Sequence, residues 1–178
     1  ALLIGLLNGF LISRLKLDPL ITTLAALIMW RGVAQVIGDG RIVPFSHPTF
    51  EALGKGYLGS MPIQVVMALG VIAFAFFCVR STLFGRYLVA VGGNEAAARL
   101  SGIKVWSILL FVYAASGLLA GLGGAMSAAR LFAANGLQLG QSYELDAIAA
   151  VILGGTSFVG GIGSIWGTLI GALIIAVL

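Results

Sequence analysis

Glu144 and Asp146 are the nearest approach in this sequence to a pair of catalytic carboxylates. Residues two apart on a helix point to different sides, so these two groups would not act together on one substrate atom. Ser142 precedes them and can cap a helix, and negative charge in the first turn is favoured by the helix dipole. We therefore favour a role at the start of a short helix over a proton relay, and we expect no catalytic residues and no enzyme activity in this chain.

Residues of the types that bind metals or nucleotides are isolated. His47 is the only histidine and Cys78 the only cysteine, so neither a metal cluster nor an internal disulfide is expected. Residues 155–162 have the glycine spacing of a phosphate-binding loop, but glycine and isoleucine stand where that loop requires Lys and Ser or Thr. We expect no metal and no cofactor, and no ATP binding through a loop of this type.

The composition is that of a membrane protein. Charged residues make up only 9% of the chain, far below the roughly 25% of soluble domains, and the mean hydropathy is +1.12. The net charge is +4, but the basic residues are not gathered into one patch with interleaved aromatic residues, so no nucleic-acid partner is expected. We predict an all-α polytopic protein in a lipid bilayer.

Apolar runs alternate with short polar connections in the pattern of a multi-pass protein, since a helix of roughly 20 residues crosses a bilayer. The loop over residues 80–104 has a net charge of +3 and the loop over residues 38–60 is neutral, so the positive-inside rule places the former in the cytoplasm. Gly5 and Gly9 form a small-residue pair that could let another helix approach closely. The predicted spans are residues 1–13 (the end of a span), 19–37, 61–79, 105–129 and a run from residue 165. Because the chain opens and closes inside apolar runs, we expect residues 1–178 to be one membrane domain within a longer permease.

Residues 147–178 contain no charge, yet they are too many for one straight crossing and too few for two crossings joined by a loop. The glycines of GGTSFVGGIGS, residues 154–164, interrupt this run and predict a broken or re-entrant helix. Open backbone at membrane depth is tolerated only against protein or water, so the break should line a cavity or reach the inner surface. Discontinuous helices of this kind are typical of transporters.

Hydroxyl side chains in or beside the apolar helices are the candidates for a translocation pathway. A second interpretation of the two threonines near residue 22 is that they bond back to their own helix. The candidate pathway residues are Thr22, Thr23, Thr156 and Ser157.

The stretch over residues 85–103, GRYLVAVGGNEAAARLSGI, predicts a short helix between two apolar runs. Asn94 is a good N-cap, Glu95 lies in the first turn, and Arg99 follows at the spacing of an ion pair. Gly102 is placed to end the helix. At about eight residues it is well below the roughly 12 to 15 at which isolated helices become marginally stable, so it requires a packing partner.

Three stretches together resemble the membrane subunit of bacterial monosaccharide ABC importers, the ribose, galactose and galactofuranose group. They are GRYLVAVGGNEAAARLSGI, YELDAIAAVILGGTSFVGGIGSIWGTLIGALI and LKLDPLITTLAALIMWRG. The resemblance runs along the whole chain in order. Asp18 departs from it, because the family commonly has an apolar residue or a proline there.

The resemblance implies the ABC importer permease fold in the bacterial inner membrane, and a cytoplasmic coupling helix that docks on an ATPase. It also implies several partners: ABC ATPase subunits, a second permease copy or a homologue, a periplasmic sugar-binding protein and a monosaccharide substrate. ATP binding would then move the coupling helices and switch the spans between outward and inward access. The residues that match the coupling helix are Asn94, Glu95, Ala96, Ala97, Ala98, Arg99, Leu100 and Ser101.

Two other classes of transport protein are alternative interpretations of the sequence. An ABC permease for branched-chain amino acids or another small solute would have the same architecture. A stand-alone secondary carrier would normally carry Asp or Glu within its spans for ion coupling, and the uncharged runs here contain none.

Overall fold

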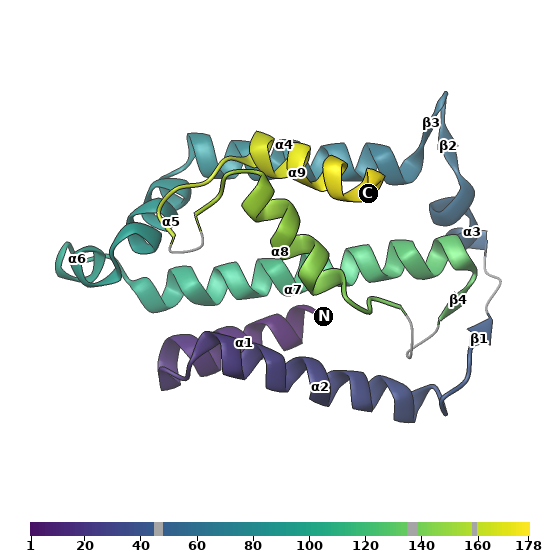
Figure 1. The fold of residues 1–178 in the computed structure, drawn as a ribbon, viewed down its shortest axis with the longest axis horizontal. Helices are drawn as coiled ribbons and strands as arrows, with labels where there is room; N and C mark the ends of the chain where they lie inside the picture. The colour runs from purple at the N-terminus through teal and green to yellow at the C-terminus, as the bar shows by residue number, and fades with distance from the viewer. Residues whose placement is uncertain (45–47, 135–138, 158–159) are drawn as a thin grey trace. The chain divides into compact units, whose positions relative to one another are not determined.

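The computed structural model describes residues 1–44, 48–134, 139–157 and 160–178 (Figure 1). The chain divides into two compact units, each described here by itself. The first unit comprises Ala1–Ala68 and Leu109–Leu139, and the second comprises Leu69–Ile108 and Gly140–Leu178.

The first unit contains α1 (Leu2–Leu15), α2 (Pro19–Ile37), α3 (Pro48–Lys55), the start of α4 (Ile63–Ser81) and most of α7 (Val105–Leu131). Two short antiparallel ladders complete it. In one, β1 (Val43–Pro44) pairs with β4 (Ala133–Ala134), and in the other, β2 (Tyr57–Leu58) pairs with β3 (Met61–Pro62).

A tight connection joins α1 to α2. Lys16 ends α1 in the left-handed conformation, with φ 54. Asp18 then caps α2, because its Oδ1 accepts from the backbone N–H groups of Leu20 (3.0 Å) and Ile21 (3.1 Å). Pro19 follows in the first turn, where its missing N–H leaves no bond unmade. Asp18 therefore provides the N-terminal cap of α2.

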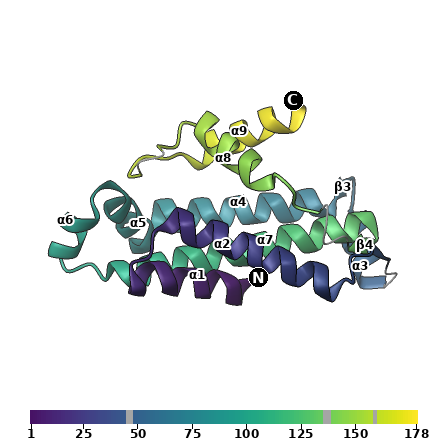
Figure 2. The same ribbon diagram turned by 60° about the horizontal axis from the view of Figure 1, so that its bottom comes forward.

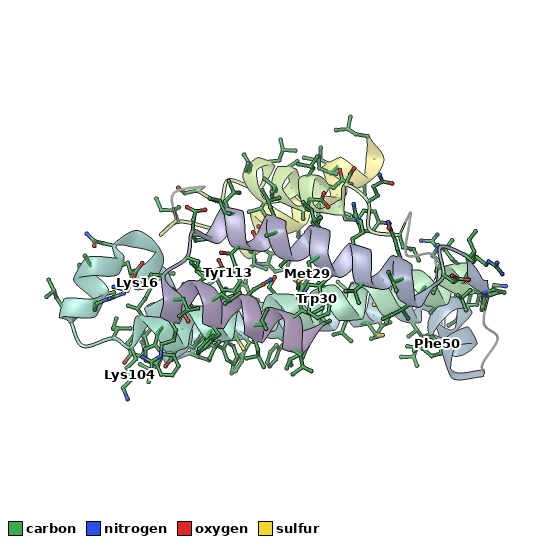
Figure 3. All side chains as sticks on the ribbon, turned by 90° about the horizontal axis from the view of Figure 1, so that it is seen from below. Lys16, Met29, Trp30, Phe50, Lys104 and Tyr113 are labelled. Carbon is green, nitrogen blue, oxygen red and sulfur yellow. The ribbon has the colours of Figure 1, made fainter. Side chains whose placement is uncertain are left out.

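Glycines let α1 and α7 pack backbone against backbone. A methyl group added at Gly9 would lie 3.0 Å from Cβ of Tyr113, and one added at Gly5 would meet the Tyr113 carbonyl. On α7, a methyl at Gly117 would lie 2.8 Å from Cα of Gly5. Tyr113, labelled in Figure 3, thus lies on the face of α7 that meets α1. The predicted close helix approach at Gly5 and Gly9 is confirmed.

The second unit contains the rest of α4, α5 (Leu83–Gly93), α6 (Glu95–Leu100), the first residues of α7, α8 (Tyr143–Leu153) and α9 (Ile165–Val177). Figure 2 shows α8 and α9 as a pair joined by an irregular segment. Small residues bring the two helices together: a methyl at Gly154 would lie 2.5 Å from the carbonyl carbon of Gly167, and one at Gly171 would meet the carbonyl of Ala150. The predicted break between Leu153 and Ile165 is therefore confirmed.

Within the described ranges of the chain, three helices, α2, α4 and α7, are long and apolar enough to cross a membrane. The predicted span over residues 19–37 is confirmed, and the spans predicted over 61–79 and 105–129 are displaced or extended by two residues, to Ile63–Ser81 and Val105–Leu131. Helices α3 and α5 and the short strands β1 to β4 were not predicted from the sequence. The glycines of α5 lower its predicted helix propensity. Gly85 is required by packing, because a side chain there would meet the backbone of Val79.

Candidate functional site: the α5–α6 segment and an adjoining cavity

The ends of α6 are closed by the residues that the sequence predicted. Asn94 Oδ1 accepts from the Ala97 N–H at 2.9 Å, and Arg99 Nη2 donates to Glu95 Oε1 at 2.6 Å. At the other end, Gly102 has φ +81 and its N–H donates to the Arg99 carbonyl at 3.1 Å. The Ile103 N–H also donates to the Ala98 carbonyl, which completes a Schellman ending.

One face of α6 packs on its own unit and the rest is exposed. Ala98 retains only 4% of its accessible surface, whereas Leu100 retains 90%. Ala96, Ala97 and Arg99 are also exposed. The apolar part of the exposed surface is formed by Leu100 together with Ala97 and Ala96, which lie three and four residues before it on the helix.

No flexible linker separates α6 from α5. Asn94 ends α5, where its N–H donates to the Ala90 carbonyl at 3.1 Å, and it also caps α6. Val91 on α5 is 8% exposed, and Val105 just beyond α6 is 3% exposed. The two short helices are therefore held in one arrangement.

Beside α5 lies a cavity of about 580 Å³, formed within the second unit by the end of α4, by α5, by the segment before α9 and by the start of α9. Aromatic and cationic groups form one side: the rings of Phe76 and Trp166 meet edge to face at 5.9 Å, and the Arg80 guanidinium lies 5.4 Å from the Phe76 ring. Hydroxyl groups form another, where Oγ1 of Thr156 and Oγ1 of Thr168 lie 3.5 Å apart. The lining also includes Leu88, Val89, Gly92, Ser157, Gly160, Gly161 and Ile162.

This combination can bind a small polar solute without reacting with it. Hydroxyls and a guanidinium offer hydrogen bonds, and aromatic rings offer apolar faces, as in binding pockets for small molecules. No group of three or more His, Cys, Asp or Glu side chains that could hold a metal occurs among the described residues, and His47 lies outside them.

The predicted carboxylates lie in the first turn of α8, as expected for a dipole role. Glu144 and Asp146 are both exposed there. Ser142 occupies the N-cap position, but its side chain makes no capping hydrogen bond. The predicted capping by the Ser142 side chain is therefore wrong, although the residue occupies the N-cap position. The negative charges of Glu144 and Asp146 complement the dipole at this end of the helix.

The four predicted pathway hydroxyls fall into two groups. Thr156 and Ser157 both line the cavity of the second unit. Thr22 and Thr23 belong to the first unit, where Thr23 Oγ1 donates to the carbonyl of Pro19 at 2.8 Å and also lies 3.2 Å from that of Leu20. The alternative that these threonines bond back to their own helix is thus confirmed for Thr23.

Arg80, Trp166 and Thr168 line the cavity with Thr156 and were not predicted from the sequence. Each belongs to an apolar helix and carries no distinguishing spacing, so only the fold brings them together. In the first unit, Asn8 Oδ1 and Trp30 Nε1 are buried without a hydrogen-bond partner among the described residues; Trp30 is labelled in Figure 3. Polar atoms of this kind need water, a solute or another part of the protein to satisfy them.

Known proteins match this chain along its whole length. The ribose import permease protein RbsC of Haemophilus influenzae is 44% identical over 180 residues, which cover 99% of this chain and 55% of that protein. The galactose/methyl galactoside import permease protein MglC of Escherichia coli is 39% identical over 183 residues, covering 98% of this chain and 54% of that protein. The galactofuranose transporter permease protein YtfT of Escherichia coli is 38% identical over 174 residues, covering 98% of this chain and 51% of that protein.

The chain therefore spans about half the length of the curated relatives that it matches. No solved structure matches it. A family model described as "Branched-chain amino acid transport system / permease component" matches residues 1–178. Together with its apolar helices, this match shows that the chain is a helical membrane protein that belongs to this family of permease components.

Proposed function

We propose that this chain is part of the transmembrane subunit of an ATP-driven sugar importer in the bacterial inner membrane. The observation that carries the proposal is α6: a capped helix of six residues that buries Ala98 and exposes Leu100 at 90%. A helix this short is not stable alone, and its exposed apolar residues offer a face on which a packing partner can dock. The names of the sugar import permeases that the chain matches support the same function.

The proposed partner of α6 is a cytoplasmic ATPase subunit. The apolar face of Ala97 and Leu100 would insert into a groove of that subunit, in the manner of a helix that docks through a few apolar anchors. Asn94, Glu95, Arg99 and Ser101 would hold the helix in shape, and ATP hydrolysis would take place on the ATPase alone. A second permease copy or homologue and a periplasmic sugar-binding protein would complete the importer.

The cavity of the second unit is the proposed part of the sugar passage. Thr156, Ser157 and Thr168 would exchange hydrogen bonds with sugar hydroxyls, and the ring of Trp166 would offer an apolar face. ATP binding and hydrolysis would change the relative stability of the inward-open and outward-open states of the permease, and the passage would open to each side in turn. The pathway role of Thr22 and Thr23 stays a prediction, and for Thr23 the bonds to its own helix favour a structural role.

An amino-acid permease is the second candidate function. Its supporting observations are the description of the family as a branched-chain amino acid transport component and the guanidinium of Arg80 in the cavity, which would donate hydrogen bonds to an amino-acid carboxylate. Competition of sugars and amino acids for uptake by the full-length permease distinguishes the two.

Co-purification tests the proposal directly. The full-length permease, expressed with the products of its neighbouring genes, is expected to bring down an ATPase and an exported sugar-binding protein, and to take up a labelled monosaccharide only with ATP. Uptake that proceeds without any ATPase would contradict the proposal and favour a secondary carrier.

A further inference from the structure

Gly92, near the end of α5, lies against the turn formed by Gly160 and Gly161 between α8 and α9. A methyl group added at Gly92 would lie 2.9 Å from the backbone nitrogen of Gly161. One added at Gly160 would lie 2.5 Å from the carbonyl oxygen of Gly92, and one added at Gly161 would lie 2.8 Å from Cα of Gly93. Real Cβ atoms essentially never approach this closely, so the two backbones meet where no side chain fits.

The turn that meets Gly92 is held together by its own backbone. The Ser157 N–H donates to the Ile162 carbonyl at 2.9 Å, and the Gly160 N–H donates to the Ser157 carbonyl at 3.2 Å. Gly160 and Gly161 have φ of +100 and +78, a region that side chains rarely adopt. Because these hydrogen bonds connect the turn to Ser157, a displacement of the two glycines also displaces Ser157, which lines the cavity.

On the α5 side of the contact, the chain continues directly into α6. Gly92 lies two residues before Asn94, which ends α5 and caps α6. The buried side chains of Val91 and Ala98 hold the two helices within one unit. A displacement of α6 is therefore carried to Gly92 over a short and rigid path.

We infer that the contact of Gly92 with the Gly160–Gly161 turn transmits movement of α6 to the cavity wall that carries Thr156 and Ser157. These three glycines act as positioning residues, because their lack of a side chain lets the two backbones meet and move as one. The inference rests on the proposed function, because docking of α6 on an ATPase supplies the movement. The contact would then link docking of the ATPase to movement of the wall of the sugar passage.

Adjacent glycines on α5 provide the test and its control. The full-length permease is reconstituted in vesicles with its ATPase and binding protein, and sugar uptake is measured per ATP hydrolysed. Gly92→Ala is expected to lower this ratio about tenfold or more, since an added methyl group that meets backbone forces a shift of the surrounding structure. Gly93→Ala, whose methyl would lie 3.9 Å from Cα of Gly161, is expected to keep the ratio near that of the wild type.

A second pair isolates the contact from backbone strain. Gly161 and Gly155 have almost the same φ, +78 and +79, so alanine is equally unfavourable at both. Only Gly161 has backbone within 4 Å of the added methyl group. Gly161→Ala is therefore expected to lose coupling well beyond the loss in Gly155→Ala. Equal behaviour within both pairs would overturn the inference.

Co-purification of the ATPase separates this inference from the proposed function. All four variants are expected to retain the ATPase, because none alters the exposed face of α6. Normal coupling in Gly92→Ala with the ATPase bound overturns the inference alone, whereas a wild-type permease that binds no ATPase overturns the proposed function.

A cross-link covers the case in which the alanine variants do not fold. Val89 and Ile162 both line the cavity, on opposite sides of the contact, and both are exposed, at 50% and 73%. In a full-length permease whose native cysteines, Cys78 among them, are replaced by alanine, Val89→Cys and Ile162→Cys are bridged by a cleavable bifunctional thiol reagent. Because the two backbones are inferred to move as one, the separation of the two thiols should not change during transport, and the yield of bridging is expected to be the same with and without ATP. A yield that changes when ATP binds would overturn the inference.

Discussion

Arg99 and Glu95 form an ion pair across one turn of α6, with Nη2 and Oε1 2.6 Å apart and both side chains more than half exposed. An exposed pair at this spacing contributes only about 0.3 to 0.5 kcal/mol. The Asn94 side chain makes the bond that starts the helix, and loss of such a cap costs about 1 kcal/mol. The helix is therefore organised by its cap more than by its ion pair.

The first prediction compares these two features. Asn94→Ala should reduce ATP-driven uptake several-fold, because a cap worth about 1 kcal/mol corresponds to a factor of about five in helix population. Glu95→Gln should change uptake by less than about twofold, the effect expected of an exposed pair. Uptake rates at equal permease levels in the membrane provide the measurement. A larger loss in Glu95→Gln would mean that the carboxylate itself contacts the ATPase.

The second prediction concerns the exposed apolar face of α6. Leu100→Asp should weaken co-purification of the ATPase about tenfold or more, which is the loss typical of a central interface residue. Leu100→Met, which keeps an apolar side chain of similar size, should retain binding. Leu17→Asp is the control at another exposed leucine, 46% exposed in the connection between α1 and α2. Equal binding by all three variants would remove α6 from the ATPase interface.

Much of this architecture could be predicted from local chemistry. The caps of α6 are encoded by Asn94 and Gly102, and the break after Leu153 by a run of glycines, because each acts within a few residues of itself. Close backbone contacts could not be predicted in the same way. Gly92 and Gly161 are far apart in the sequence, and nothing near either one indicates the other. The cavity escaped prediction for the same reason, since its lining comes from three separate segments.

The third prediction tests the packing of α1 on α7. In Gly117→Ala the methyl group would lie 2.8 Å from Cα of Gly5, whereas in Gly123→Ala, on the same helix, nothing lies within 4 Å. Gly117→Ala should destabilise the permease by about 1 to 3 kcal/mol through overpacking. Gly123→Ala should be neutral or stabilising by up to about 1 kcal/mol, because alanine favours the helix. Thermal unfolding in detergent measures both, and a common shift for the pair would contradict the predicted contact.

The fourth prediction tests whether the hydroxyls of the cavity contact the substrate. In Thr156→Val the hydroxyl that lies 3.5 Å from Oγ1 of Thr168 is replaced by a methyl group of nearly the same volume. Loss of one hydrogen bond to a sugar is worth about 1 kcal/mol, so KM for uptake should rise about five-fold. Thr156→Ser should restore it. The matched control is Thr23→Val, because the Thr23 hydroxyl already bonds to its own helix and its loss should leave KM unchanged. If Thr23→Val raises KM and Thr156→Val does not, the passage lies in the first unit, where Asn8 and Trp30 hold buried polar atoms without partners among the described residues.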